Sequence, residues 1–520
     1  MSSDKVDERT RRILFWCILL TGAALRFVLL GRVPAGLNQD EASAGYEAWS
    51  LLHDGIDRNG SAFPVLFKAW GSGQNVLYSY LSMPFIALFG LNAASLRLTA
   101  AVYGTLSLPL LYSAVRETGD ERAALWSMAA LAIDPWHILL SRWALESNLL
   151  PFCLLLGIWA LTKLSRDGRF LLAASAAFAL ALYAYGTAFF FLALFLPPAA
   201  VYILVKKRVT YRTFFLSLGI FLLLALPITL CQLRNALSLG ELRLLGMTLP
   251  RLNEARQSSV SILGGGGGLS AMRENLRAFF RLLLTQNDGL IWNYAGRFGL
   301  LYGKPGLLLA LAGAVCAIVN MVRKRALDAN AWCLLWFAAS LAAACFISVN
   351  VNRVNMAFLP LVWLQGLALA ALARPFRAAA PSLALILLAL GTAFSRYYFT
   401  DYAEAIAPCF YDGLGEAIEY ACADEDDTVW VSFDVNMPYI FVLFYEQLPP
   451  QAYLDTVQYM NPGGAFEWVT AFDRYRFGYD VPPEDGTVCI LRADKLRGIE
   501  PEARYGEWCV VRMRVASYGP

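Results

Sequence analysis

The sequence predicts an α-helical polytopic membrane protein with about 11 transmembrane helices and a small extracytoplasmic α/β domain at the C-terminus. Of its 520 residues, 58% are hydrophobic and 16% are charged, and the mean hydropathy is +0.50. Apolar runs long enough to cross a bilayer recur up to about residue 400, where acidic residues become frequent and the runs shorten. This composition excludes a soluble globular protein, and no nucleic acid is expected as a partner.

The apolar runs and the basic residues between them predict the topology. The predicted spans lie near residues 13–31, 95–115, 123–140, 147–164, 170–185, 187–205, 213–231, 305–322, 331–348, 354–373 and 381–397. Every second connection is basic, with Arg116 and Arg122; Lys163, Arg166 and Arg169; Lys206, Lys207, Arg208 and Arg212; Arg323, Lys324 and Arg325; and Arg374 and Arg377. The positive-inside rule therefore predicts a cytoplasmic N-terminus, and an odd number of spans exports the C-terminus from the cytoplasmic membrane.

The same topology places four other segments outside the membrane. They are the loop 32–94, the turn 142–146, the loop 232–304 and the turn 350–355. The apolar run 76–90 is too short for a full span, so we interpret it as an interfacial or re-entrant helix.

The long loop 232–304 contains two further features. Five consecutive glycines at 264–268 lack the Lys-Ser/Thr pair of a phosphate-binding loop, so they predict a flexible hinge. After them, the run 272–284 has helical spacing with Arg273, Arg277 and Arg281 along one side. This pattern predicts a helix that lies on the membrane surface.

Composition divides the chain into two predicted domains. Residues 1–399 form a transmembrane domain with the extracytoplasmic loops 32–94 and 232–304, and residues 400–520 form the exported α/β domain. In the second domain we expect strands at 428–433 and 487–491 and helices at 412–421 and 438–447. Four of the ten cysteines lie there, at Cys409, Cys422, Cys489 and Cys509. An even number of cysteines in an exported domain predicts at least one disulfide, with three pairings open.

The stretch 36–46, Gly-Leu-Asn-Gln-Asp-Glu-Ala-Ser-Ala-Gly-Tyr, follows the first span and contains the first candidate site. Asp40 and Glu41 are adjacent carboxylates with no cation beside them in the sequence. Ionised groups near hydrocarbon are costly, and their presence at the mouth of a membrane helix indicates a functional site. The alternative is structural, because Asp40 or Ser43 could be the N-cap of the following helix.

The other outward segments contain further candidates. Arg142 and Glu146 are four residues apart, so they share one face if the helix continues, and the alternative is an interfacial anchor. His137 and His53 are the only histidines, which argues against a histidine-rich metal site.

Two cations could bind a phosphate group. Arg353 lies in the turn Asn350-Val-Asn-Arg-Val-Asn355 and is the only basic residue there, and a guanidinium suits a phosphate through its two parallel donors. Lys68 is a second candidate, with snorkelling of its side chain to the interface as the alternative.

Together these features resemble a family of C-type membrane glycosyltransferases, the protein O-mannosyltransferases and aminoarabinose transferases. The motifs are the acidic pair after the first span, Ser141-Arg142-x-x-x-Glu146, and Asn350-x-x-Arg353-x-Asn355. The likeness covers residues 13–200 and 330–400, whereas the loop 232–304 and the C-terminal domain match only in kind. Members of the family transfer a sugar from a polyprenyl phosphate outside the cytoplasmic membrane, with inversion at the anomeric carbon. They include bacterial proteins similar to dolichyl-phosphate-mannose-protein mannosyltransferases.

The resemblance implies roles for individual residues. Asp40 matches the catalytic acid, Glu41 its neighbour and Glu146 the second acidic residue. Arg142 and Arg353 match positions that face the lipid phosphate, and His137 and Asn352 lie beside these motifs as further substrate-binding candidates. The chain departs from the family where many bacterial members have Lys-Pro-Pro-Leu, because here Gln74-Asn-Val-Leu77 stands in that place. Lys68 is the candidate to replace the missing lysine.

The residue types fit this chemistry. A carboxylate can take the proton of an attacking hydroxyl, and arginines can stabilise the departing phosphate. The expected partners are a polyprenyl-phosphate-linked sugar, a hydroxyl acceptor in a lipid, glycan or protein, and membrane lipids. Asp40 and Glu146 could hold a divalent metal, which the sequence does not require. The rival functions are a transporter or flippase for a lipid-linked sugar and a non-catalytic envelope assembly subunit.

Overall fold

The computed structural model describes residues 7–70, 73–254, 268–375, 378–464, 466–479, 485–496 and 498–513. The chain forms two compact units. Unit 1 contains Met1–Val28, Ala100–Thr229 and Arg256–Tyr402, and unit 2 contains Leu29–Thr99, Leu230–Ala255 and Ala403–Pro520. Of the predicted glycine hinge, residues 264–267 lie outside the described residues.

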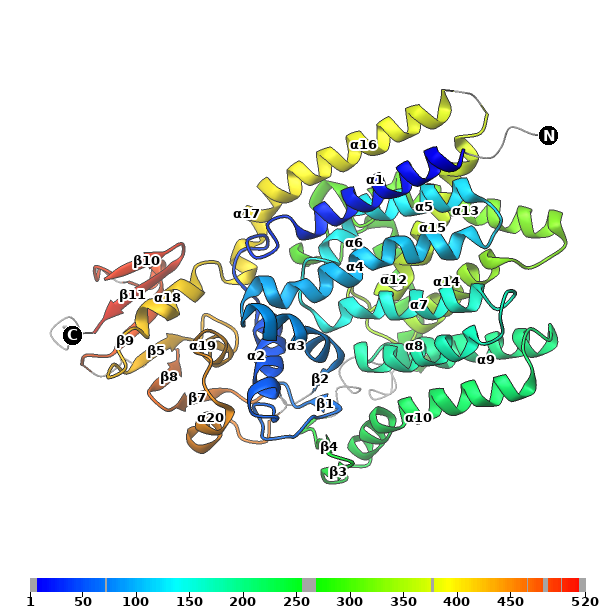
Figure 1. Cartoon of the computed structure of the whole chain (residues 1–520). Coiled ribbons are helices and arrows are strands. Elements are labelled where there is room, and N and C mark those ends of the chain that lie inside the picture. Colours follow the sequence, from blue (N-terminus) through cyan, green and yellow to red (C-terminus); the bar gives the residue numbers. More distant parts are fainter. Residues whose placement is uncertain are drawn as a thin grey trace. The chain divides into compact units, whose positions relative to one another are not determined.

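Unit 1 is a bundle of helices (Figure 1). Its helices and short helical turns are α1 (Glu8–Phe27), α4 (Ala93–Arg116), α5 (Glu121–Ile133), α6 (Pro135–Leu140), η1 (Glu146–Leu149), α7 (Leu150–Thr162), α8 (Phe170–Ala184), α9 (Ala188–Val205), α10 (Tyr211–Ala236), α12 (Gly268–Thr285), η2 (Ile291–Asn293), η3 (Gly296–Phe298), α13 (Gly303–Lys324), α14 (Ala329–Ala344), η4 (Asn355–Ala357), α15 (Phe358–Leu372), α16 (Ala379–Tyr397) and η5 (Tyr398–Tyr402). Helix α15 is the centre of the bundle, because it packs against α5, α13 and α14 and its residues 358–370 are all buried.

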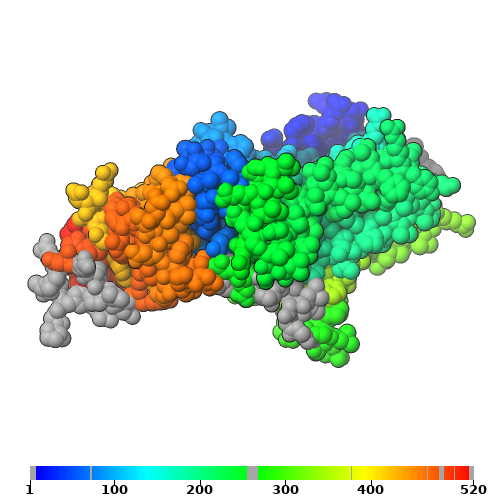
Figure 2. Space-filling view, turned by 90° about the horizontal axis from the view of Figure 1, so that it is seen from below, coloured from blue at the N-terminus to red at the C-terminus, as the bar shows by residue number. Residues whose placement is uncertain are grey.

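The described residues include six helical segments that are long and apolar enough to cross a membrane. They are Ala93–Arg116, Ala188–Val205, Tyr211–Ala236, Gly296–Lys324, Asn355–Leu372 and Ala379–Phe410. Helix α10 indicates the environment of these segments, because its apolar side chains Phe215 and Leu223 are 65% and 69% exposed. In Figure 2, a wide area of the surface of α9 and α10 (green) is not covered by other parts of the chain. Large apolar side chains facing outward suit a lipid environment, so the chain is a multi-pass membrane protein; the number of eleven spans stays a prediction.

Most predicted spans coincide with a helix to within a few residues, but the span 123–140 is interrupted. Helix α5 ends at Ile133, and Asp134 is the N-cap of α6, where its side chain accepts a hydrogen bond from the His137 N–H. Pro135 stands at the first position of α6. A proline has no N–H to donate to the preceding turn, so it ends one helix and begins the next.

Among its described residues, unit 2 combines helices with three β-sheets. Its elements are α2 (Gln39–His53), β1 (Leu66–Phe67), β2 (Gln74–Asn75), α3 (Leu77–Phe89), β3 (Leu242–Leu244), β4 (Met247–Leu249), α17 (Ala403–Ile406), η6 (Ala407–Phe410), α18 (Leu414–Ala421), β5 (Val429–Ser432), α19 (Pro438–Glu446), α20 (Pro450–Thr456), β6 (Gln458–Tyr459), β7 (Val469–Phe472), β8 (Tyr475–Gly478), β9 (Val488–Arg492), η7 (Ala493–Lys495), β10 (Ala503–Tyr505) and β11 (Trp508–Arg512). Helices α4 and α10 have residues in both units.

The C-terminal part of unit 2 is an α/β fold. Among the described residues, seven strands form one sheet in the order β10-β11-β9-β5-β8-β7-β6, with β5 parallel to β8 and β9. The strands predicted at 428–433 and 487–491 are β5 and β9, and the predicted helices are α18 and α19. The fold class is therefore confirmed. The boundary of a separate exported domain at residue 400 stays a prediction.

The predicted disulfide is contradicted, because all four C-terminal cysteines are free thiols. Cys489 and Cys509 lie on neighbouring strands, but the register pairs Cys489 with Val511 and Cys509 with Leu491. Diagonal neighbours of this kind are roughly 7–8 Å apart, which is farther than a disulfide spans. Cys489 instead packs with Trp430, Val511 and Met513 in the core of the sheet.

Candidate active site

The acidic pair opens helix α2 in unit 2, and neither member is its N-cap. The N-cap is Asn38, whose side chain accepts a hydrogen bond from the Glu41 N–H at 2.9 Å, while Glu41 Oε2 accepts one from the Asn38 N–H at 3.3 Å. This capping box corrects the alternative in which Asp40 or Ser43 caps the helix. Asp40 lies in the first turn, where the helix dipole favours a carboxylate.

Glu41 is fully buried and forms a two-pronged ion pair with Arg97 of α4. Its two oxygens accept hydrogen bonds from Arg97 Nε and Nη2, both at 2.8 Å. The same guanidinium donates to the backbone oxygens of Pro34 and Gly36, at 2.7 and 2.8 Å. Glu41 and Arg97 thus fasten the segment before α2 to α4. This is a structural role, and breaking such a buried pair costs about 3–5 kcal/mol.

Asp40 is only half buried, and its contacts differ from those of Glu41. Asp40 Oδ1 accepts a hydrogen bond from the indole N–H of Trp70 at 3.2 Å. Gln74 donates to the Asp40 backbone oxygen at 3.4 Å and accepts from the Ser43 hydroxyl at 2.9 Å. The Trp70 indole is thus a neutral donor that orients the Asp40 carboxylate.

A buried cluster of charged side chains packs against Trp70. The guanidinium of Arg58 lies 5.0 Å from the centre of the Trp70 ring and forms an ion pair with Glu47, with 3.0 Å between Nη1 and Oε1. Asp57 is adjacent and accepts hydrogen bonds from the N–H groups of Asn59 and Ser61. Burial raises the pKa of Glu47, although the cation of Arg58 opposes this shift. Burial, reinforced by the charge of Glu47, raises the pKa of Asp57 to about 8.

This pKa has a simple physical origin. One guanidinium can neutralise one carboxylate, and the second buried carboxyl group then keeps its proton. The cation of Arg58 lies against the Trp70 ring, which in turn donates to Asp40. The cluster thus fixes the indole that orients Asp40.

Lys68 lies near the same region of unit 2 but has an acidic partner. Its Nζ is 3.6 Å from Glu467 Oε2. A lysine that is paired with a carboxylate has less charge to offer a phosphate, and its predicted role in substrate binding stays a prediction.

The remaining candidates lie in unit 1, beginning with His137 on α6. Nδ1 of His137 lies 2.7 Å from Nη2 of Arg26, and both residues are buried. A guanidinium can only donate, so Nδ1 of His137 accepts and its proton is on Nε2. Arg26 also donates to the backbone oxygens of Leu131 and Ala132 at the end of α5. His137 thus helps to join α1 to the break between α5 and α6.

Arg142 is buried at the end of α1, and the helix does not continue from it to Glu146. Its Nη1 donates to the backbone oxygens of Leu25 and Arg26, and its Nε donates to the Tyr398 hydroxyl, all at 3.1 Å. Helix α6 ends at Leu140, and the Ser141 hydroxyl donates to the His137 backbone oxygen one turn back. The condition under which Arg142 and Glu146 would share a helical face is therefore not met.

Glu146 is buried at the start of η1, next to the turn that carries Arg353. The side chain of Asn355 donates to the Ser147 oxygen at 2.6 Å, which connects the two segments. Asn352 donates to Asn293 Oδ1 at 3.0 Å, so the turn is also held by the segment after α12. The structure thus brings the Glu146 and Arg353 motifs together in unit 1.

Arg353 is the cation best placed to bind an anion. It is half exposed, and its guanidinium donates to the backbone oxygen and the hydroxyl of Ser348. Among the described residues no carboxylate forms an ion pair with it. The Asn350 side chain accepts from the Arg353 N–H at 2.8 Å and fixes the turn. A positioned guanidinium with neutral partners can accept a phosphate as its counterion.

Comparisons with known proteins identify the fold. A family model described as dolichyl-phosphate-mannose-protein mannosyltransferase matches residues 74–231. The crystal structure of ArnT from Cupriavidus metallidurans bound to undecaprenyl phosphate is similar, with a TM-score of 0.59 at 14% identity over 99% of this chain and 100% of that one. Its apo form gives a TM-score of 0.56 at 14% identity over the same shares, 99% and 100%.

The chain has the fold of a C-type membrane glycosyltransferase. The predicted resemblance to this group is thereby confirmed. The Archaeoglobus fulgidus oligosaccharyltransferase in complex with Zn and sulfate is similar too, with a TM-score of 0.50 at 14% identity, and the match covers 83% of this chain and 61% of that one. A comparison with curated protein sequences finds no match.

A metal centre has little support in the residues of this C-type fold. Within the described ranges, no group of three or more His, Cys, Asp or Glu side chains could hold a metal ion. A divalent metal held by Asp40 and Glu146 stays a prediction, and the proposed reaction does not depend on one.

Sequence reasoning missed the residues that hold the candidates in place. Arg97, Trp70, Arg58 and Arg26 each contact a candidate or its neighbour from a distant part of the chain. Arg97 and Arg26 did give a signal, since each is a cation inside or beside an apolar run. Trp70 gave none, because an aromatic residue near a membrane surface is ordinary.

Proposed function

We propose that the protein is an inverting glycosyltransferase that moves a hexose or a pentose from a polyprenyl-phosphate donor to a hydroxyl acceptor on the outer face of the cytoplasmic membrane. The observation that carries the proposal is the contrast within the acidic pair. Glu41 is fully engaged by Arg97, whereas Asp40 is half buried and oriented by a neutral indole donor. The ArnT structure with the same fold contains undecaprenyl phosphate, which supports a donor of this class.

Asp40 is the general base in this mechanism. One of its carboxylate oxygens takes the proton of the acceptor hydroxyl as the acceptor oxygen bonds to the anomeric carbon. The bond between that carbon and the phosphate oxygen breaks at the same time, and polyprenyl phosphate leaves from the opposite side. Attack from one side and departure from the other inverts the anomeric centre. The Trp70 N–H holds the carboxylate in one orientation.

Arg353 binds the phosphate of the donor. Negative charge grows on the phosphate oxygens as the sugar leaves, and a fixed guanidinium stabilises this charge more than it stabilises the bound donor. Glu146 lies next to the Arg353 turn, because the Asn355 side chain donates to the Ser147 backbone oxygen. Because Arg142 is buried and donates to α1 and Tyr398, we assign it a positioning role at the end of α1.

The transporter and assembly-subunit alternatives make different predictions. A flippase moves a labelled polyprenyl-phosphate sugar between leaflets and releases no polyprenyl phosphate. An assembly subunit does neither, and the Asp40→Asn variant would then behave like the wild type. The charged candidates collect at helix ends and turns rather than at the middle of spans, which favours the transferase over a transporter.

The test is turnover by the full chain in vesicles that contain a polyprenyl-phosphate hexose or pentose together with lipid, glycan and peptide hydroxyl acceptors, read as free polyprenyl phosphate. Asp40→Asn keeps the shape and the Trp70 hydrogen bond but removes the base, so turnover should fall roughly 10²- to 10⁴-fold with an unchanged melting temperature. Glu41→Gln should instead lower the melting temperature, because it leaves Arg97 buried without its counterion.

The matched control is Asp54→Asn, at the exposed C-terminal end of the same helix, which should change neither quantity. Near wild-type turnover of Asp40→Asn would remove Asp40 from the mechanism. Release of polyprenyl phosphate from neither a hexose nor a pentose donor would refute the proposed function.

A further inference from the structure

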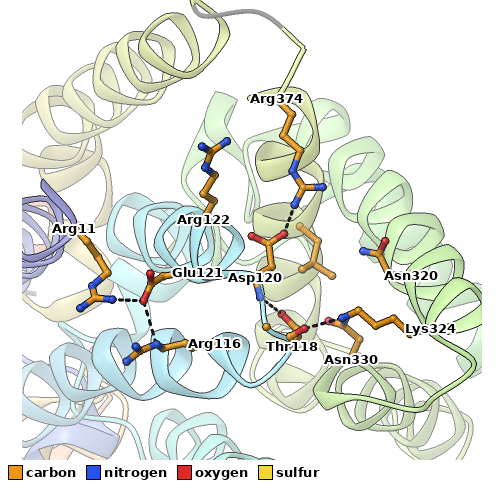
Figure 3. A pocket seen from close by; sticks show the side chains of 12 residues that line it. Arg11, Arg116, Thr118, Asp120, Glu121, Arg122, Asn320, Lys324, Asn330 and Arg374 are labelled. Atoms are coloured by element: carbon orange, nitrogen blue, oxygen red, sulfur yellow. Dashed lines mark hydrogen bonds and ion pairs between the residues drawn. The ribbon is translucent and has the colours of Figure 1, made fainter. Parts of the chain in front are cut away.

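A polar cavity of about 620 Å³ lies among the helix ends of unit 1 (Figure 3). It is lined by Arg11, Arg116, Thr118, Gly119, Asp120, Glu121, Arg122, Asn320, Leu367, Lys324, Asn330 and Arg374. Arg116 is the last residue of α4, Glu121 the first of α5 and Lys324 the last of α13, so the cavity is at one end of these helices. None of these residues is among the candidates for the transfer reaction.

The cavity is rich in positive charge. Among the described residues that line it, five are cations and two are carboxylates. Glu121 accepts from Arg11 at 2.5 Å and lies 3.2 Å from Arg116 Nε, and Asp120 pairs with Arg374. Asp120 is also occupied as the N-cap of α5. The two carboxylates hold the arginines in position but do not balance their charge.

The cations that line the cavity have N–H donors that a bound anion can use. Arg116, Lys324 and Arg374 are each about half exposed, and a guanidinium has five N–H donors, more than one carboxylate can use. Lys324 is oriented by donating to the Thr118 backbone oxygen at 2.8 Å, and Asn330 is held by the Trp363 indole, which donates to its Oδ1. Figure 3 shows the side chains of Arg116, Lys324 and Arg374, which come from separate segments of the chain, around the cavity.

The size and position of the cavity indicate the ligand. A volume of this size holds a small molecule or a lipid headgroup. The residues that line the cavity come from the N-terminal segment and from the basic connections near 116–122, 323–325 and 374. The positive-inside rule assigns all of these segments to one membrane face. Helix ends of membrane spans lie at the depth of the headgroups, where basic pockets between helices bind anionic lipids.

We propose that this cavity binds the phosphate group of an acidic membrane lipid, at a site separate from the transfer reaction. The arginines that Asp120 and Glu121 hold in place supply paired N–H donors for the phosphate oxygens. The lipid joins the ends of α1, α4, α5, α13 and α15 through one charged group. A free phosphate ion has the same chemistry, so the experiment separates the two sources.

The test measures binding of short-chain phosphatidylglycerol, short-chain phosphatidylcholine and inorganic phosphate to the purified full chain. The wild type should bind phosphatidylglycerol, bind phosphatidylcholine much more weakly, and show no competition by millimolar phosphate. Each arginine removed should cost roughly fivefold in affinity, so Arg122→Gln with Arg374→Gln should lose about 25-fold. The matched control is Arg166→Gln with Arg208→Gln, two exposed arginines outside the cavity, which should stay within twofold of the wild type.

A second variant protects the test against misfolding. Asn320→Asp adds a negative charge to the lining without removing any ion pair, and it should weaken phosphatidylglycerol binding about as much as removing one arginine. Equal binding of the two lipids, or unchanged affinity in both cavity variants, would overturn the proposal. Competition by phosphate at the concentration of the lipid would overturn the lipid as the source and assign the cavity to free phosphate.

Discussion

At the scale of single residues, the sequence predicted the acidic pair but not the division of roles within it. Asp40 and Glu41 look alike in sequence because no cation stands beside them. The structure separates their roles through Arg97, which is 56 residues from Glu41 in the sequence and forms a buried ion pair with it. Local patterns contain no information on which distant cation will be buried against which carboxylate, and burial of that pair decides the structural role.

The buried carboxyl group of Asp57 makes a prediction about pH. Its pKa is about 8 in the folded protein and about 3.9 in the unfolded chain, so between these values only the folded state keeps the proton. The stability that this group contributes is full below about pH 4 and falls by roughly 1.4 kcal/mol per pH unit until about pH 8. Asp57→Asn cannot titrate and should lose this dependence.

The measurement is the melting temperature of the wild type minus that of Asp57→Asn from pH 5 to 9. This difference should fall steadily to about pH 8 and then level off. Asp54→Asn, on the exposed end of α2, is the matched control measured over the same pH range. A flat profile for Asp57→Asn would show that the buried carboxyl group is ionised throughout.

At the scale of elements, the helices were predictable because each apolar run must satisfy its own backbone inside a membrane. The predicted spans 170–185, 187–205 and 305–322 are α8, α9 and α13. The exceptions have local chemistry that overrides the apolar pattern, as where Asp134 and Pro135 divide the span 123–140. Packing partners such as α13 with α15 could not be predicted, because both are apolar on most of their surface.

The packing of α13 on α15 depends on Gly313. A Cβ atom at this position would lie 1.8 Å from the backbone oxygen of Leu364, so the two helices would have to separate. Gly313→Ala should therefore destabilise unit 1 by about 1–3 kcal/mol and lower the apparent melting temperature. Gly219→Ala on α10 is the matched control, since no described atom lies within 4 Å of its added methyl group. A Gly313→Ala protein as stable as this control would contradict the close packing of α13 and α15.

At the scale of the whole molecule, the distribution of charge relates the fold to the membrane. The basic residues Arg11, Arg116, Lys324 and Arg374 are far apart in sequence, and unit 1 brings them to a single cavity. Such convergence is what the positive-inside rule requires of connections that share one side of a membrane. The candidates Glu146 and Arg353 lie in other connections, joined to each other through Asn355 and Ser147.

This arrangement leads to a prediction about orientation. If the basic cavity faces the cytoplasm, an enzyme reporter that is active only outside the cytoplasm should be inactive when fused after Arg325 and active when fused after Tyr411. A reporter that is active only in the cytoplasm should give the opposite pattern. The physical reason is the membrane potential together with the anionic inner leaflet, both of which favour lysine and arginine on the cytoplasmic side. Activity of the exported reporter after Arg325 but not after Tyr411 would reverse the orientation and place the proposed transfer reaction on the cytoplasmic face.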